Sequence, residues 1–233
     1  MNTQALIRSS YLNTIPQRKL QELLLSIENS KDDLQTKNVK SIAINRYAES
    51  NIPVEYWALK MERDFKGDNR LLAKYNEYIS DLKASYMNGT SICFSGPHGV
   101  GKSLNVTCIL KKASQKGYSC HYSELSNIIS VLISATNEEK LIAKRELSLV
   151  DFLVIDEIDS RFLPSDNASD LFARSLESVF RTRSQNKLPT LMCTNSPNIV
   201  EIFKGALKES LDSLMNGYLT IFPVFGKDFR KQK

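Results

Sequence analysis

The residues best suited to chemistry form a glycine-rich segment that ends in lysine and serine, Gly96-Pro-His-Gly-Val-Gly-Lys-Ser103. Glycines let the backbone curl so that successive N–H groups point at phosphate oxygens beside a helix N-terminus. In this pattern the lysine ammonium reaches the β- and γ-phosphates, and the serine hydroxyl is offered to Mg²⁺. The segment therefore predicts a nucleotide site whose members are Gly96, Pro97, His98, Gly99, Val100, Gly101, Lys102, Ser103 and Leu104.

A second candidate is the apolar run Phe152-Leu-Val-Ile-Asp-Glu157, which ends in two acids. A carboxylate at the C-terminal tip of a buried strand beside a phosphate loop is well placed to hold Mg²⁺. We expect Asp156 to take that role and Glu157 to polarise the attacking water as general base. The alternative is that both acids only solvate the end of a strand.

A third candidate, Asn195, follows the apolar run 190–193. Its amide is able to bind the γ-phosphate or the lytic water, and it is therefore a candidate catalytic residue. The alternative is a turn-forming Asn before Ser196-Pro197, because Asx side chains commonly hydrogen-bond the backbone in turns.

Short apolar runs alternate with helical stretches from residue 90 onward. Five buried strands alternating with helices predict an α/β fold with a parallel sheet covered on both faces. The expected strands are 91–94, 119–122, 152–155, 190–193 and 218–222, and the expected helices are 102–116, 125–135, 171–183 and 199–214.

The chain before the sheet is expected to be helical. Leu20, Leu23, Leu24 and Ile27 recur on one helix face, and a second helix is expected over 71–87. We place a boundary near residue 45, which divides a small helical, partner-binding region (1–45) from an ATPase domain (46–233). Between the two helical parts, Tyr56 and Trp57 either flank the nucleotide base or anchor the N-terminal region.

Composition excludes several classes of protein. Of the 233 residues, 42% are hydrophobic and 24% are charged, which is too apolar for a disordered chain and typical of a globular one. No apolar run approaches the roughly 20 residues that span a bilayer, so no membrane partner is expected. The four cysteines lack metal-site spacing, and a reducing cytoplasm is the expected location. The net charge of +5 permits contact with nucleic acid.

These motifs, in this order, resemble those of the AAA+ ATPases: a Walker A loop, an Ile-Asp-Glu Walker B strand and a Thr-Asn sensor. The segment Leu149-Val-Asp-Phe-Leu-Val-Ile-Asp-Glu-Ile158, with Leu188-Pro-Thr before Thr194-Asn195, is similar to the DnaC/DnaI helicase-loader and IstB transposition-helper group. The segment Asn51-Ile-Pro with Tyr56-Trp57 is also similar to that group, and the resemblance covers roughly residues 45–230.

The resemblance implies a P-loop NTPase core with a five-stranded sheet, no full helical lid, and a need for ATP and Mg²⁺. It implies an ATP-dependent loader that binds a replicative DNA helicase and single-stranded DNA and forms a homo-oligomer when ATP is bound. Alternative functions are a transposition helper and a nucleotide-gated regulator without DNA contact. The short, divergent chain suggests a bacterial protein, or a phage protein in the host cytoplasm.

The chain departs from the family pattern at its arginines. Glu209 occupies the position where the group has an arginine finger, which predicts slow ATP turnover by the isolated protein. Arg230 is a candidate sensor, and Arg183 is a candidate contact to a neighbouring subunit or DNA, with an exposed helix-end arginine as its alternative. Further candidates for DNA contact share a basic side chain on an expected helix or its end: Lys111, Lys112, Lys116, Arg174, Arg181 and Lys187.

Overall fold

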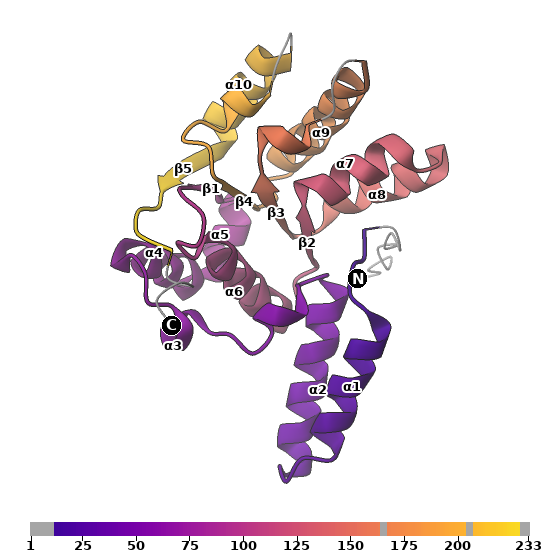
Figure 1. Ribbon diagram of the computed structural model, residues 1–233, viewed down its shortest axis with the longest axis vertical. Helices are drawn as coiled ribbons and strands as arrows, with labels where there is room; N and C mark the ends of the chain where they lie inside the picture. The colour runs from indigo at the N-terminus through magenta and orange to yellow at the C-terminus, as the bar shows by residue number, and fades with distance from the viewer. Residues whose placement is uncertain (1–11, 164–166, 204–206, 229–233) are drawn as a thin grey trace.

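A computed structural model describes residues 12–163, 167–203 and 207–228, and it shows a central sheet flanked by helices, with a helical hairpin projecting away (Figure 1). The strands are β1 (Ser91–Ser95), β2 (Cys120–Glu124), β3 (Phe152–Ile158), β4 (Thr190–Thr194) and β5 (Leu219–Pro223). Their order is β2-β3-β4-β1-β5, and every pair is parallel. The predicted five-stranded parallel sheet is therefore confirmed.

Strands β1 to β4 are buried on both faces, whereas the edge strand β5 is partly exposed. Side chains of consecutive strand residues point to opposite faces. Ile92 and Phe94 belong to one hydrophobic core, whereas Cys93 between them belongs to the other. The first core is completed by helices α4 (Asn69–Ser80) and α6 (Lys102–Gln115). The second is completed by α7 (Leu125–Ser134), α8 (Asn137–Leu149), α9 (Asn167–Gln185) and α10 (Leu207–Tyr218). This two-layered covering explains why the strands read as continuous apolar runs.

The helices of the sheet region mostly fall where the sequence predicts them, with several differences. The expected helix 71–87 is two helices, α4 and α5 (Leu82–Asn88), separated at Asp81, and α2 (Leu34–Glu49) was not predicted. Helix α8 was not predicted either, although Thr136 and Glu139 form a capping box at its start. The predicted helix 199–214 is wrong at its start, where residues 199–203 form only a short 3-10 turn, η3 (Val200–Ile202). A further 3-10 turn, η2 (Ser160–Phe162), follows β3.

The N-terminal part begins with a hairpin of two helices, α1 (Gln17–Glu28) and α2 (Leu34–Glu49). The expected boundary at residue 45 therefore falls inside α2, four residues before that helix ends at Glu49. The chain then reverses at Asn51, whose φ of 54° is in the left-handed region. It continues through η1 (Val54–Tyr56), α3 (Met61–Asp64) and α4 to α5 (Leu82–Asn88), which leads into β1.

After β5 the described chain continues to residue 228 without forming a helix. It stays attached to the sheet, because the Val224 N–H donates to the Ser95 carbonyl over 2.7 Å. Among the described residues, no helix is long and apolar enough to cross a membrane.

Candidate functional site

The glycine-rich segment forms a loop between β1 and α6 at the carboxyl end of the parallel strands. Gly99 and Gly101 have φ values of 75° and 98°, a conformation that side chains other than glycine rarely adopt. Helix α6 starts directly after Gly101, so its unpaired N–H groups face the loop. The local structure is the one that an anion-binding loop requires.

Lys102 connects this loop to the neighbouring strand end. Its ammonium Nζ donates to the Gly96 carbonyl at 2.6 Å, the Pro97 carbonyl at 2.7 Å and the Asn195 amide oxygen at 2.9 Å. The structure thus brings together the predicted lysine and the predicted Asn195, which are 93 residues apart in the chain. The turn after Asn195 is made by Thr194, whose hydroxyl accepts the Ser196 N–H.

The two acids of β3 lie in different environments. Asp156 is buried, and its oxygens accept the Glu157 N–H at 2.8 Å and the Tyr122 hydroxyl at 2.9 Å. Glu157 is exposed and has a left-handed φ of 52°, where the register of β3 against β4 shifts between Ile155 and Ile158. A backbone strained in this way is common at functional sites. The bulge gives Glu157 an exposed position beside the buried Asp156.

These residues line one cavity of about 550 Å³. Its lining combines the phosphate loop with the ends of β3 and β4 and with η1 and the segment that follows it. The lining residues are Glu55, Tyr56, Leu59, Asp64, His98, Gly99, Gly101, Lys102, Ser103, Leu104, Asp156, Glu157, Cys193, Thr194 and Asn195. The phosphate loop, both acids and Asn195 therefore share one open space.

Residues 92–215 match the model of the ATPase family associated with various cellular activities (AAA). That match spans more than half of the chain. The chain belongs to this family. It is accordingly a nucleotide-binding ATPase. No curated protein sequence matches it.

Solved structures of replication proteins share the fold of this AAA ATPase. The crystal structure of DnaI has a TM-score of 0.58 at 18% identity, covering 76% of this chain and 93% of DnaI. The DnaC helicase loader has a TM-score of 0.57 at 18% identity, covering 74% of this chain and 100% of that one. The replication initiator DnaA bound to AMPPCP and single-stranded DNA has a TM-score of 0.58 at 16% identity over 75% of this chain. The chain spans about half of the DnaA structure, 51%.

The donor groups in the ATPase cavity fit Mg²⁺. The Ser103 hydroxyl and the Asp156 carboxylate line the same space, and Mg²⁺ is commonly held by one or two carboxylates together with substrate phosphates. Within the described residues, no cluster of three or more His, Cys, Asp or Glu side chains forms a complete metal site. When bound, Mg²⁺ would neutralise charge on the phosphate oxygens.

Three side chains around the metal position were not assigned to the metal site from the sequence. The Tyr122 hydroxyl contacts Asp156 from β2, and burial raises the pKa of this phenol, as does the charge of Asp156. Glu124 pairs in register with Asp156, and its pKa is raised by burial and by the charges of Glu157 and Asp156. Tyr56 lies near Ser103 rather than only anchoring the N-terminal region. An acid that ends a strand, as in β3, was the available signal for Glu124.

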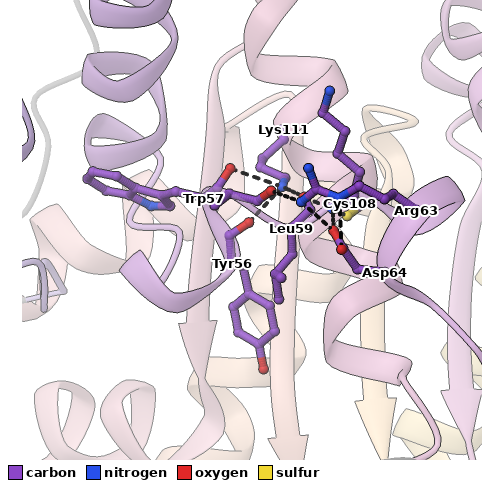
Figure 2. A network of polar contacts seen from close by, with 9 residues as sticks. Tyr56, Trp57, Leu59, Arg63, Asp64, Cys108 and Lys111 are labelled. Carbon is purple, nitrogen blue, oxygen red and sulfur yellow. Dashed lines mark hydrogen bonds and ion pairs between the residues drawn. The ribbon is translucent and has the colours of Figure 1, made fainter. Parts of the chain in front are cut away.

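Lys111 holds the segment that carries Tyr56 (Figure 2). Its buried ammonium donates to the carbonyls of Tyr56 at 2.7 Å and of Leu59. Burial lowers the pKa of this lysine, and the surrounding carbonyls accept hydrogen bonds from its N–H groups. The expectation that Lys111 contacts DNA is therefore wrong. Trp57, in contrast, donates its indole N–H to the Ile52 carbonyl at 2.7 Å and serves as an anchor.

Arg183 lies at the opposite end of the sheet and is completely buried. Its guanidinium donates to the carbonyls of Leu147, Val150 and Pro189 and to the Thr190 hydroxyl, at 2.6 to 2.9 Å. The expected contact of Arg183 with a subunit or DNA is wrong, and so is the alternative of an exposed helix end. Its role is to join α9 to the starts of β3 and β4. Arg230 lies outside the described residues.

Proposed function

We propose that this AAA ATPase is an ATP-dependent loader that delivers a replicative DNA helicase onto single-stranded DNA, acting as a nucleotide-gated adaptor. The observation that carries the proposal is the pairing of a nucleotide cavity with a projecting helical hairpin that presents apolar side chains. The fold match to helicase loaders along nearly their whole length supports it, since the match to DnaA covers only half of that protein.

In the proposed reaction, ATP binds with its phosphates on the loop 96–103. Lys102 would exchange its carbonyl partners for phosphate oxygens, and the side chain of Asn195 would then be released from its contact with Lys102. Ser103 and Asp156 would hold Mg²⁺, and Glu157 would polarise the attacking water as general base. Because Asn195 already contacts Lys102, it is placed to respond when the γ-phosphate is lost.

A second cavity of about 440 Å³ is lined in part by Val100 of the phosphate loop, and we propose that it receives the nucleotide base. Its wall includes Phe225 and Asp68, both of which contact Arg70 in this structure. An aromatic ring and a carboxylate suit a base that stacks and donates from its amino group. Phe225→Ala is expected to weaken binding of ATP more than binding of inorganic triphosphate, measured by competition with a fluorescent nucleotide.

The hairpin is the proposed contact for the helicase. Large apolar side chains that are normally buried are exposed on it, with Leu34 75%, Val39 62% and Ile42 53% exposed on α2, and Leu25 exposed on α1. Large apolar side chains that several positions of one element expose are able to contact another protein. A projecting helix pair that exposes such side chains fits a groove or a partner helix.

The test is capture of purified replicative helicase by the full chain with ATP present. The triple variant Leu34→Glu, Val39→Glu and Ile42→Glu is expected to abolish capture while ATP binding is unchanged. The control is Leu141→Glu, which makes one such substitution, and so adds a third of the charge, at a 69% exposed leucine on α8. Capture of helicase by the triple variant would contradict the contact. Binding of a transposase instead of helicase would favour the transposition-helper function, and binding of neither would favour a regulator.

Single-stranded DNA is the proposed nucleic-acid partner, with Arg174 and Arg181 on α9 as contacts. Both are exposed, and Arg181 pairs with Glu177 at 2.7 Å. Charge reversal of Arg174 and Arg181 together is expected to reduce ATP-dependent DNA binding and the dependence of that binding on salt concentration. Reversal of Lys83 and Arg145, which are exposed and are not candidates for DNA contact, changes net charge equally and is the control. Equal losses in both variants, by fluorescence anisotropy, would point to general charge attraction.

We further propose that the isolated protein turns over slowly, on the order of 10⁻² per second or less, as nucleotide switches do without a partner. Among the described residues, no arginine lines the ATP cavity, and Glu209 is exposed on the first turn of α10. An arginine finger accelerates phosphoryl transfer roughly 10³–10⁵-fold. Steady-state phosphate release tests this, and turnover above about one per second would show that a finger already acts within an ATP-bound homo-oligomer.

A further inference from the structure

The carboxylate of Asp156 is held from two sides. One oxygen accepts the backbone N–H of Glu157 at 2.8 Å, and the other accepts the hydroxyl of Tyr122 at 2.9 Å. Both Asp156 and Tyr122 are at least nine-tenths buried, with 2% and 5% exposed. With both oxygens engaged, rotation of this carboxylate breaks at least one hydrogen bond. Its orientation toward the cavity is therefore fixed before any ligand arrives.

Tyr122 is itself fixed by its backbone. It lies on β2, an edge strand, and pairs on its inner side with Val154 of β3. On its outer side, the Tyr122 N–H donates to the Ser50 carbonyl at 2.9 Å, and its carbonyl accepts the Asn51 side-chain amide at 2.8 Å. The turn that ends the helical hairpin therefore takes the place of a neighbouring strand.

We propose that Tyr122 is a positioning residue for ATP hydrolysis, which sets the Asp156 carboxylate for Mg²⁺ and is itself set by the Ser50–Asn51 turn. The inference rests on the proposed role of Asp156 as a metal ligand. It also assigns a physical route from the hairpin to the metal position: α2, the turn, one strand residue and one carboxylate.

The size of the effect follows from how metal ligands respond to their supporting partners. Loss of a group that hydrogen-bonds a ligating side chain typically costs about 10–100-fold in metal affinity or activity. Tyr122→Phe removes only the hydroxyl and keeps the ring, which belongs to the hydrophobic core beneath α6. The phosphate loop is untouched, so binding of nucleotide without metal is expected to stay the same.

The chain offers a matched control at the start of β3, the strand that carries Asp156 near its other end. Tyr86 donates its hydroxyl to Asp151, just before β3, over 2.8 Å. Tyr86→Phe therefore also removes one tyrosine–aspartate hydrogen bond, but far along the strand from the cavity. A general cost of losing such a bond appears in both variants, whereas a cost to metal positioning appears only in Tyr122→Phe.

In the first experiment, Mg²⁺ is titrated into the full-length protein in the presence of a fluorescent ATP analogue. A parallel series in EDTA measures nucleotide binding without metal. In a second experiment, electron paramagnetic resonance follows the binding of Mn²⁺ to the ADP complex. Tyr122→Phe is expected to raise the half-saturating metal concentration about 10–100-fold, with unchanged affinity in EDTA. Tyr86→Phe is expected to match wild type. Wild-type metal dependence in Tyr122→Phe, or equal losses in both variants, would overturn the proposal.

Two more variants complete the design. Asn51→Gly keeps the left-handed backbone without strain but loses the amide that binds the carbonyls of Tyr122 and Leu12 and the Thr14 N–H. A smaller shift in the same direction is expected. No shift would remove the turn from the proposed route. Asp156→Asn tests the underlying assignment: if it leaves metal dependence unchanged, the proposed metal role of Asp156 fails, an outcome distinct from failure at Tyr122 alone.

Discussion

The two ends of strand β3 carry similar residues in opposite circumstances. At the start of the strand, Asp151 accepts the Tyr86 hydroxyl and both the N–H and the hydroxyl of Ser119, each at 2.8 Å. At its end, Asp156 also accepts a tyrosine hydroxyl, but it lines an open cavity beside Glu157.

The basic residues at the two ends differ in the same way. Arg183, near the start of β3, is enclosed by protein carbonyls, and no ligand can reach it. Lys102 lies on the cavity wall and can exchange its carbonyl partners for phosphate. Residue type alone therefore does not separate structural from functional polar groups. What separates them is whether an open space adjoins the satisfied group.

The largest effect is expected at the functional end, for Glu157→Gln. A positioned general base contributes about 10²–10⁴-fold to the rate, and the amide cannot take a proton. ATP binding should be unchanged, because the loop 96–103 makes the phosphate contacts. Single-turnover hydrolysis and fluorescent-nucleotide titration measure the two quantities. An equal loss of binding would show that Glu157 supports the site rather than the reaction.

At the structural end, Arg183→Met is expected to lower the free energy of unfolding by about 3 kcal/mol or more. The substitution leaves several buried acceptors without donors, and each one costs roughly 1–3 kcal/mol. Arg181→Met, on the exposed side of the same helix, should stay within about 0.5 kcal/mol of wild type. Urea unfolding gives both values. A DNA-binding defect in Arg183→Met with normal stability would show that Arg183 is a functional residue rather than a structural one.

Lys102→Ala is expected to weaken ATP binding by about 10–100-fold, since a hydrogen bond to a charged group contributes roughly 1.5–3 kcal/mol. Stability should change little, because the carbonyls of Gly96 and Pro97 lie at the cavity and water can replace the ammonium. Calorimetric titration with ATP in EDTA isolates this contact from the metal. Unchanged affinity would contradict the prediction and would mean that the backbone N–H groups of the loop bind the phosphates without help from Lys102.

The sequence predicted the functional end of the sheet better than the structural end. The phosphate loop and the acids of β3 are contiguous patterns, so they could be found without knowing the fold. The role of Tyr122 depends on β2 lying beside β3, and its partner is 34 residues away. Burial of Arg183 depends on carbonyls from α8 and the loops before β3 and β4. Contacts of this kind become visible only when the strand order is known.

Local sequence patterns also explain why the strands were predicted and why helix α8 and the domain boundary were not. The capping box at Thr136 and Glu139 is a sequence pattern that indicates the start of α8. The helix has few consecutive apolar residues, so its hydrophobic pattern alone does not predict it. The strands were found within three residues at each end, and four of the five are buried on both faces and therefore read as apolar runs. The expected domain boundary has no such signal, and α2 continues through it to Glu49.

The smallest effect, and the sharpest comparison, comes from one substitution made at both ends of β3. Asp151→Asn keeps an oxygen acceptor but brings an amide N–H₂ against one of its donors, Tyr86 or Ser119. The expected loss is about 1 kcal/mol of unfolding free energy, the usual contribution of one hydrogen bond, with no change in metal dependence. Asp156→Asn also brings an amide N–H₂ against one of its donors, Glu157 or Tyr122, so a similar loss of stability is expected. It also removes the carboxylate that faces the cavity, so metal dependence should change there. Urea unfolding and Mg²⁺ titration are measured on both variants, and the two ends of the strand differ in function only if metal dependence changes in Asp156→Asn alone. A loss of metal dependence in Asp151→Asn would mean that strain travels along β3, and that Asp156 is positioned by the whole strand rather than by Tyr122.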